Sequence, residues 1–147
     1  PISEQEAPKE VAISVTLPDG WTKVEGSVLE HQYGKGTASF MIKNEYALNG
    51  RGLDEAVREA KEQIGKYFDN ADFSDIETIR VGGQDARSMT YTYAVKAAGM
   101  NMSMKMQGVY VMINSKCYLI SFGDMESSFD ALAPDFEQIL NGIQFEN

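Results

Sequence analysis

Three consecutive segments in the second half of the chain alternate apolar and polar residues, and this pattern constrains the fold most strongly. In residues 86–96 the odd positions from 89 onward carry Met, Tyr, Tyr and Val, while positions 88, 90 and 92 carry Ser or Thr. A period of two residues is typical of a strand with one packed and one solvated face. Residues 100–113 and 117–122 follow after short turns. We therefore expect three neighbouring antiparallel strands.

Two other segments change to a helical period. In residues 53–68 and 126–141 the apolar side chains recur at spacings of three and four, as one face of a helix requires. Pro134 lies inside the second segment and has no N–H to donate, so we expect a break there, with Pro134 opening a new first turn. Gly142 is expected to end this helix.

Shorter strands are expected where residues alternate in polarity or lie between turn residues. They are residues 11–17, 28–33, 37–46, 76–81 and 143–145. The predicted order is βββα-ββββ-α-β, which defines an α+β protein with a mainly antiparallel β-sheet flanked by two principal helices.

The first ten residues differ in composition from the rest of the chain. Residues 1–10 contain two prolines and three glutamates and have little to bury, which indicates a flexible leader or tether. Residues 11–147 are expected to form a single domain. Because the chain begins with proline, either a processed exported protein or a trimmed cytosolic protein fits this start.

The charge of the chain excludes some partners. With 22 acidic and 13 basic side chains the formal net charge is −9, which argues against nucleic acid, because phosphate binding needs clustered Lys and Arg. No apolar run approaches the roughly 18 residues that cross a bilayer. Residues 79–116 carry five basic side chains and one acidic side chain, whereas residues 117–147 carry six acidic side chains and no Lys or Arg.

This acidic C-terminal segment is our candidate interaction surface for a protein partner with a basic surface. Its proposed members are Asp124, Glu126, Asp130, Asp135 and Glu137. A patch of one sign accelerates encounter with an oppositely charged partner. The alternative is a solvated face that keeps the protein soluble.

The single cysteine and single histidine leave no catalytic or zinc-binding constellation to nominate. One cysteine forms no intrachain disulfide, and no Cys/His cluster has the spacing of a structural zinc site. We expect Cys117 to be a small buried apolar residue and His31 to face water on a strand. No catalytic residue and no cofactor are predicted.

Four methionines, Met100, Met102, Met104 and Met106, alternate along one predicted strand. Side chains two residues apart share a face, and clustered thioethers are soft ligands that accept Cu(I). The alternative is that the methionines pack against a helix as flexible core residues. The opposite face of this strand carries Asn101, Ser103, Lys105 and Gln107.

These polar residues are expected to lie beside Ser88, Thr90 and Thr92 of the preceding strand. Such a polar face has two interpretations. It is either a recognition surface for a ligand or peptide, or the ordinary solvated side of an antiparallel sheet.

Several segments, in their order along the chain, resemble the PsbP-like family. They are Leu17-Pro18-Asp19-Gly20-Trp21, Gly36-Thr37-Ala38-Ser39-Phe40, Leu53-Asp54-Glu55-Ala56-Val57, Gly82-Gly83-Gln84-Asp85-Ala86-Arg87, Tyr118-Leu119-Ile120-Ser121-Phe122 and residues 136–145. That fold is shared with a nuclear-transport factor that binds the small GTPase Ran. The resemblance covers nearly all of residues 11–147 and implies an antiparallel sheet flanked by helices, in an accessory module and not an enzyme.

The resemblance also bears on location, because bacterial relatives include exported lipoproteins. It implies an extracytoplasmic protein of the bacterial cell envelope, either secreted or held by a lipid anchor upstream of residue 1. The resulting hypothesis is a non-enzymatic binding or accessory module with a protein partner. The alternative is a Cu(I) or small-ligand binding protein that uses the methionine stripe.

Overall fold

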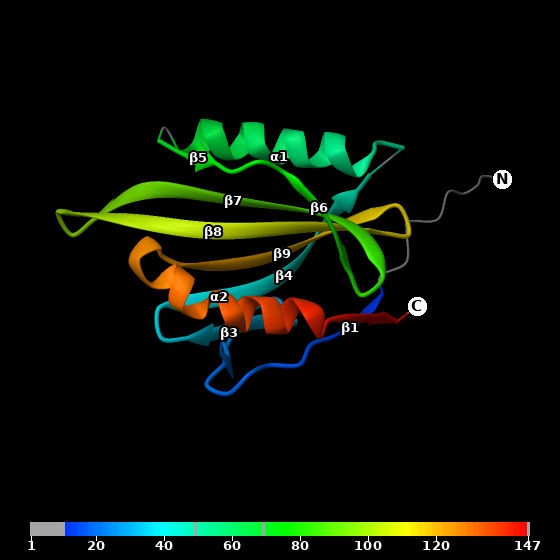
Figure 1. The fold of residues 1–147 in the computed structure, drawn as a ribbon, viewed down its shortest axis with the longest axis horizontal. Helices are drawn as coiled ribbons and strands as arrows, with labels where there is room; N and C mark the ends of the chain where they lie inside the picture. The colour runs from blue at the N-terminus through cyan, green and yellow to red at the C-terminus, as the bar shows by residue number, and fades with distance from the viewer. Residues whose placement is uncertain (1–10, 49, 69, 147) are drawn as a thin grey trace.

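The computed structural model describes residues 11–48, 50–68 and 70–146, and the structural statements below concern those residues. The expected leader, residues 1–10, lies outside them. Most of the chain forms an eight-stranded antiparallel sheet with a helix on each face (Figure 1). The expected α+β class, with a mainly antiparallel sheet and two principal helices, is confirmed.

The strands of the large sheet follow in chain order. They are β2 (Thr22–Lys23), β3 (His31–Lys35), β4 (Ala38–Ala47), β5 (Asp72–Phe73), β6 (Glu77–Val81), β7 (Gln84–Ala97), β8 (Met100–Ile113) and β9 (Lys116–Met125). Across the sheet the order is β2-β3-β4-β9-β8-β7-β5, and β6 also pairs with β7. A separate two-stranded ladder joins β1 (Ala12–Ser14) to β10 (Gln144–Glu146).

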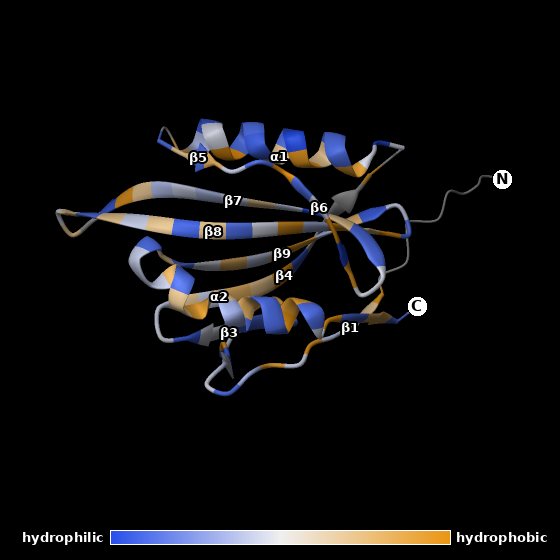
Figure 2. Ribbon diagram, viewed as in Figure 1, coloured by the Kyte–Doolittle hydropathy of each residue, from blue (hydrophilic) through white to orange (hydrophobic). Residues whose placement is uncertain are grey.

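The two helices cover opposite faces of the sheet because residues of β8 and β9 alternate between them. On one face, α2 (Glu126–Asn141) buries Phe136 and Ile139 against Phe122 of β9. On the other, α1 (Leu53–Tyr67) packs against Tyr110 of β8 and Cys117 of β9. The apolar side of α1 faces the sheet in Figure 2. Full burial of a large apolar side chain contributes about 1.5–3 kcal/mol, so both faces stabilise the fold.

Several strand boundaries differ from expectation. The first strand spans only Ala12–Ser14, because its partner β10 has three residues; Val15 and Leu17 pack on the core without a ladder. The second strand begins three residues later than predicted, at His31. Two strands of two residues each, β2 and β5, were not predicted.

The turn between β8 and β9 is one residue shorter than predicted. Asn114 and Ser115 form it with positive φ angles of 53° and 64°, and Lys116 already belongs to β9. A positive φ at both central residues matches the right-handed twist of a hairpin. This turn aligns Ile113 with Lys116 and thereby sets every later pair of β8 and β9.

The expected break at Pro134 is wrong, because α2 is one helix from Glu126 to Asn141. Its first turns are set at an angle to the rest in Figure 1. Pro134 and Asp130, the residue whose carbonyl loses its donor, are both exposed. Water can hydrate that carbonyl, so the helix bends without ending.

His31 also departs from expectation, because its side chain is only 12% exposed. Its Nε2–H donates to the carbonyl of Ile13 at 3.0 Å, and the hydroxyl of Tyr33 donates to Nδ1 at 3.1 Å. The imidazole therefore ties β3 to β1 and does not face water.

Candidate functional site

A polar strip on the α2 face of the sheet forms the floor of the main candidate site. Thr90 pairs with Gln107 and Thr92 with Lys105 in the β7–β8 register, as the sequence predicted. Gln107 Nε2 donates to Ser88 Oγ at 3.1 Å. Ala86 lies on the same face and is fully buried in the apolar core, so the polar strip begins at Ser88.

Three cavities lie along this strip, between α2 on one side and the segment from residue 70 to residue 79 on the other. Two of them share Glu77, Ser88 and Gln107, and the third lies farther along β7, beyond Lys105. Their volumes are about 360, 360 and 180 Å³. We call the hollow that they form the acidic trough. Its lining residues are Asn70, Ser74, Asp75, Glu77, Ile79, Ser88, Thr90, Thr92, Tyr93, Ala94, Ser103, Gln107, Glu126, Ala133, Phe136, Glu137 and Leu140.

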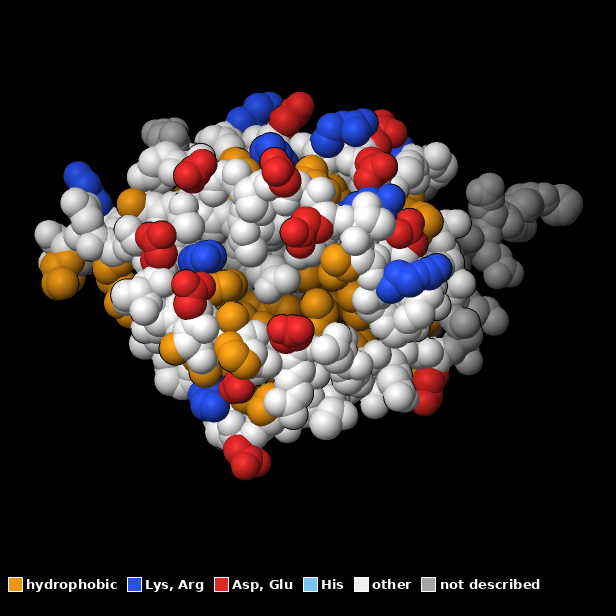
Figure 3. Space-filling model, in the orientation of Figure 1, with side chains coloured by type: hydrophobic (Ala, Val, Ile, Leu, Met, Phe, Trp, Pro, Cys, Tyr) orange, Lys and Arg blue, Asp and Glu red, His pale blue; other side chains and the backbone are white. Residues whose placement is uncertain are grey.

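The trough carries charge of one sign. Four carboxylates line it, those of Asp75, Glu77, Glu126 and Glu137, and the lining contains no Lys or Arg. All four side chains are exposed. Figure 3 shows apolar side chains inside the hollow at the middle of this face, with acidic side chains around it. The trough therefore combines an apolar and hydroxyl-bearing floor with an acidic rim.

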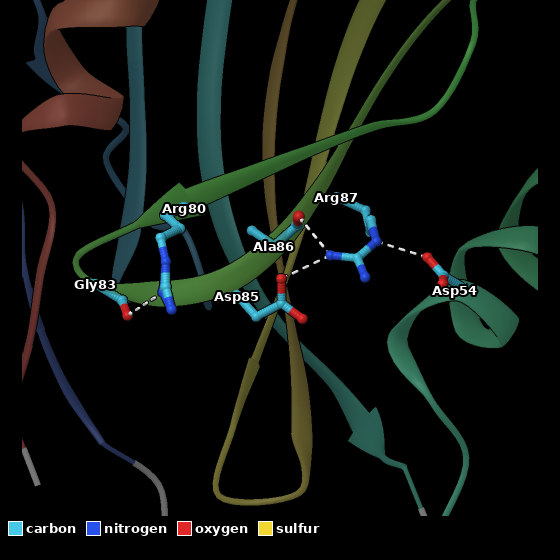
Figure 4. A network of polar contacts seen from close by, with 6 residues as sticks. All are labelled: Asp54, Arg80, Gly83, Asp85, Ala86 and Arg87. Atoms are coloured by element: carbon cyan, nitrogen blue, oxygen red, sulfur yellow. Dashed lines mark hydrogen bonds and ion pairs between the residues drawn. The ribbon is translucent and has the colours of Figure 1, made fainter.

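The basic side chains near the trough either point to the other face of the sheet or bind a carboxylate or carbonyl oxygen. Arg87 donates to Asp54 of α1 at 2.6 Å and to Asp85 at 2.7 Å, on the opposite face of the sheet (Figure 4). These two hydrogen bonds raise the pKa of Arg87 further. Arg80 reaches the carbonyl of Gly83. Lys105 lies on the trough face, 3.5 Å from Asp130 Oδ1 and above the Phe129 ring.

The five acidic residues predicted as one surface do not share one environment. Glu126 and Glu137 line the trough, and exposed Asp130 lies beside Lys105. Asp124 is 1% exposed, so its assignment to an interaction surface is wrong. One of its oxygens accepts from Thr37 Oγ1 and the Met125 N–H, and the other, Oδ2, is buried with no hydrogen-bond partner.

Asp135 is turned inward as well. Its Oδ2 accepts hydrogen bonds from Trp21 Nε1 at 2.9 Å and from Lys35 Nζ at 3.0 Å. These two donors favour the ionised carboxylate and hold the pKa of Asp135 below its ordinary value. Asp135 therefore fastens the N-terminal strands to α2, and the rim acids of β5–β6 replace it in the candidate surface.

The methionine stripe lies on the other face of the sheet, the α1 face. Met104 and Met106 are paired with Tyr93 and Tyr91 of β7, and both remain partly exposed. Met102 is partly exposed, and Met100, at the tip of the β7–β8 hairpin, is 65% exposed. The expected alternation along one strand is therefore present, and these side chains are accessible to solvent.

Another cavity, of about 490 Å³, lies between α1 and the sheet on this face. Tyr91, Tyr110 and Leu119 line it from the sheet, and the ion pair of Arg51 and Glu59 lies at its edge. Burial, with a smaller contribution from Tyr93, raises the pKa of Tyr91 to about 12. The phenol therefore stays neutral and available as a donor over the physiological range.

No group of three or more His, Cys, Asp or Glu side chains among the described residues could hold a metal ion. Cys117 is fully buried, as the sequence predicted. Sequence reasoning missed Asp75 and Glu77, and the only available signal was that Asp75 directly precedes, and Glu77 lies near the start of, a predicted strand at residues 76–81.

Comparison with known proteins finds relatives at the level of structure only. No family model and no curated protein sequence matches the chain. The solved structure of LpqN, involved in cell envelope biogenesis of Mycobacterium tuberculosis, superposes with a TM-score of 0.69 at 12% identity, over 96% of this chain and 87% of LpqN. The solution structure of cyanobacterial PsbP from Synechocystis superposes with a TM-score of 0.59 at 11% identity, over 97% of this chain and 98% of that one.

The chain has a PsbP-like fold. The resemblance noted in the sequence is thereby confirmed for the fold. A third structure with this architecture is PA94, a protein of unknown function from Pseudomonas aeruginosa, with a TM-score of 0.63 at 13% identity over 95% of this chain and 87% of PA94. Among the described residues, no helix combines the length and apolar character that a membrane crossing requires.

Proposed function

We propose that residues 11–147 form a single non-enzymatic accessory domain of the bacterial cell envelope that binds a basic segment of a partner protein in the acidic trough. The observation that carries this proposal is the lining of the trough, which holds four carboxylates and neither Lys nor Arg. An acidic, concave surface with low-dielectric walls attracts cationic groups and raises their rate of encounter.

The shape of the trough favours an extended polypeptide over a compact ligand. Its floor follows β7 from Ser88 to Ala94, which at about 3.3 Å per residue spans about 20 Å, or six residues of extended chain. Ser, Thr and Gln side chains on the floor provide hydrogen bonds, while Ile79, Phe136 and Leu140 provide apolar contact. A segment that alternates basic and apolar residues matches both.

The envelope location is supported by two observations. The solved structure of LpqN, which shares this fold, is of a protein involved in cell envelope biogenesis. The composition of residues 1–10 suits a tether between the folded domain and a membrane anchor. Fractionation of cells that express the gene tests the location directly, and recovery of the protein in the cytoplasmic fraction would contradict it.

The binding experiment uses a peptide probe. An eight-residue peptide that alternates lysine and valine is titrated into isotope-labelled protein, and the same peptide with glutamate for lysine serves as the negative probe. We expect the amide signals of Ser88, Thr90 and Gln107 to shift with the lysine peptide only. We also expect the affinity to fall as salt screens the exposed charges.

Two variants with the same net charge distinguish attraction of the peptide by the trough from attraction by the net charge of the whole protein. Glu77→Lys/Glu137→Lys reverses two charges of the trough, and Glu25→Lys/Glu62→Lys reverses two exposed charges outside its lining. Exposed charge pairs contribute about 0.2–1 kcal/mol each, and each reversal replaces an attraction by a repulsion, so the trough variant should bind about tenfold more weakly. The control should lose less than about threefold. Equal losses in the two variants would show that only the net charge matters.

A second experiment searches for the partner in cells. A photo-crosslinking residue placed at Thr90, in the trough floor, should capture one envelope protein in a reaction that Glu77→Lys/Glu137→Lys abolishes. The same residue placed at Glu25 should not capture it. Capture from both positions would contradict the trough as the contact surface.

A further inference from the structure

Thioether groups from two adjacent strands come together on the α1 face, opposite to the acidic trough. Met104 of β8 lies directly across from Met125 of β9, and Met106 lies across from Gly123. Directly opposed residues have Cβ atoms about 4.5–5.5 Å apart, and residues two apart on one strand are separated by about 6.6 Å. Met104, Met106 and Met125 therefore occupy three corners of one small area of the sheet.

Gly123 occupies the fourth corner and leaves room for a side chain. A Cβ atom at this position would clash with Sδ and Cε of Met106. The thioether of Met106 thus lies over the backbone of β9, two residues from Met125 on the same face. Met104 lies beside both, since it is adjacent to Met106 along β8 and opposed to Met125.

Flexible side chains allow these three sulfur atoms to reach a common point. Methionine is unbranched, so a change of rotamer can direct its sulfur toward the centre of the area without backbone movement. Met104, Met106 and Met125 are partly exposed, so an ion can reach them from solvent. Tyr91 and Tyr93, paired with Met106 and Met104, close the side toward β7.

We propose that Met104, Met106 and Met125 form a binding site for Cu(I). Neutral thioethers are soft ligands that select Cu(I) over Mg²⁺ or Ca²⁺, which require oxygen ligands. The set differs from the four-methionine stripe of the sequence: Met125 enters it, Met102 lies next to it, and Met100 at the hairpin tip is not a ligand. The ion binds as Cu(I) and leaves as Cu(I), so no electron transfer takes place.

The experiment uses Cu(I) under ascorbate, with a chromophoric chelator as competitor, and Ag(I) as a redox-inert probe. The protein carries ¹³C-labelled methionine methyl groups, which report the ligands individually. We expect one equivalent of either ion to bind and to shift the methyl signals of Met104, Met106 and Met125 most strongly. X-ray absorption of the Cu(I) form should show sulfur ligands only.

The decisive variant is Met104→Leu/Met125→Leu, with Met89→Leu/Met112→Leu as its matched control. Both remove two methionines and nearly conserve volume, and the control pair packs in the core beneath α1, outside the proposed set. We expect the first variant to bind Ag(I) at least about 100-fold more weakly and the control to stay within about threefold of wild type. Circular dichroism confirms that both variants are folded.

A third variant tests the role of the glycine corner. Gly123→Ala places a methyl group that clashes with Met106 Sδ, and because the displaced atoms are the flexible end of a side chain, the fold should persist. Ag(I) affinity should fall by about tenfold or more. Equal affinity of Met104→Leu/Met125→Leu and its control, or no uptake by the wild type at micromolar Cu(I), would overturn the proposal. Peptide binding in the trough is measured separately and does not depend on this outcome.

Discussion

Removal of the Asp135 carboxylate should destabilise the protein by a predictable amount. Trp21 is 7% exposed, and its indole N–H donates to Asp135 at 2.9 Å. In Asp135→Ala this buried donor has lost its acceptor, which costs about 1–3 kcal/mol. Lys35 is 34% exposed, so water can hydrate its ammonium group in the variant, and the lost ion pair adds at most a few tenths of a kcal/mol to the destabilisation. We therefore expect a loss of about 2 kcal/mol, or about 6 °C in melting temperature for a chain of this length.

Two further variants isolate the cause of this loss. Asp135→Asn keeps an oxygen acceptor for the indole and removes only the charge, so it should cost less than Asp135→Ala. Asp130→Ala removes the same residue type from the same helix, where the side chain is 87% exposed and lies 3.5 Å from Lys105. It should change stability by less than about 0.5 kcal/mol.

The pH dependence of this contribution has a definite sign. The hydrogen bonds from Trp21 and Lys35 lower the pKa of Asp135 in the folded protein, so at acid pH the unfolded chain binds more protons than the folded one. The contribution of the charge is present above the ordinary aspartate pKa, near pH 4, and is lost as pH falls below it. The stability gap between wild type and Asp135→Asn should therefore narrow from pH 7 to pH 3.

Thermal unfolding followed by circular dichroism and by the fluorescence of the single tryptophan measures all of these quantities. If Asp135→Ala were no less stable than Asp130→Ala, the buried indole would not depend on this acceptor. A gap between wild type and Asp135→Asn that stays constant down to pH 3 would refute the role assigned to the charge.

Three other predictions concern the sheet. Gly82→Ala should lower the free energy of unfolding, measured with denaturant, by about 2–3 kcal/mol, because the φ of 57° disfavours a side chain and a Cβ would lie 2.8 Å from the Phe145 ring of β10. Gly83 has a φ of 82° and open space around it, so Gly83→Ala should lower that free energy by only about 1 kcal/mol. An ultraviolet titration should show a tyrosine that ionises near pH 12, and this ionisation should be missing in Tyr91→Phe. Because burial favours the neutral phenol in the folded state, the contribution of Tyr91 to stability is lost as pH rises from about 10 to about 12. Phe122→Ala, in the fully buried ring cluster, should cost about 3–5 kcal/mol, whereas Val28→Ala, 99% exposed, should have no measurable effect.

Periodicity predicted the elements that bury the most apolar surface. The alternation of β7 and β8 and the helical spacing of α1 and α2 are strong signals, because each long element must present one apolar face to a core. The side-by-side placement of Ser88, Thr90 and Gln107 also followed from the sequence. By contrast, β2 and β5 contain two residues each, too few for any period to be recognised.

Residue contacts across strands were harder to predict, because they depend on single turn residues. With a three-residue turn after Ile113, Met104 would lie opposite Glu126; with the observed turn at Asn114 and Ser115 it lies opposite Met125. A shift of one residue moves a side chain to the other face. The sequence pattern alone therefore could not predict that Met125 joins Met104 and Met106 in the candidate Cu(I) site.

The burial of individual charged side chains could not be predicted from the sequence either. Asp124 and Glu126 are two residues apart and have the same charge, yet the first is enclosed beside Thr37 and the second is exposed at the start of α2. The difference arises because Asp124 is the last inward-facing residue of β9 before the chain turns into the helix. Local composition carries no information about such a boundary.

The ladder between β1 and β10 brings the two ends of the described chain together, since Ala12 pairs with Glu146. The tip of the β7–β8 hairpin lies at the far end of the molecule from β1 and β10 (Figure 1). Mechanical tension applied between the two termini would load this three-residue ladder first and leave the long strands unstretched. Conversely, a short peptide linker across the two ends, with new termini opened at Ala98 and Gly99, would give a circular permutant that keeps every pairing of the large sheet.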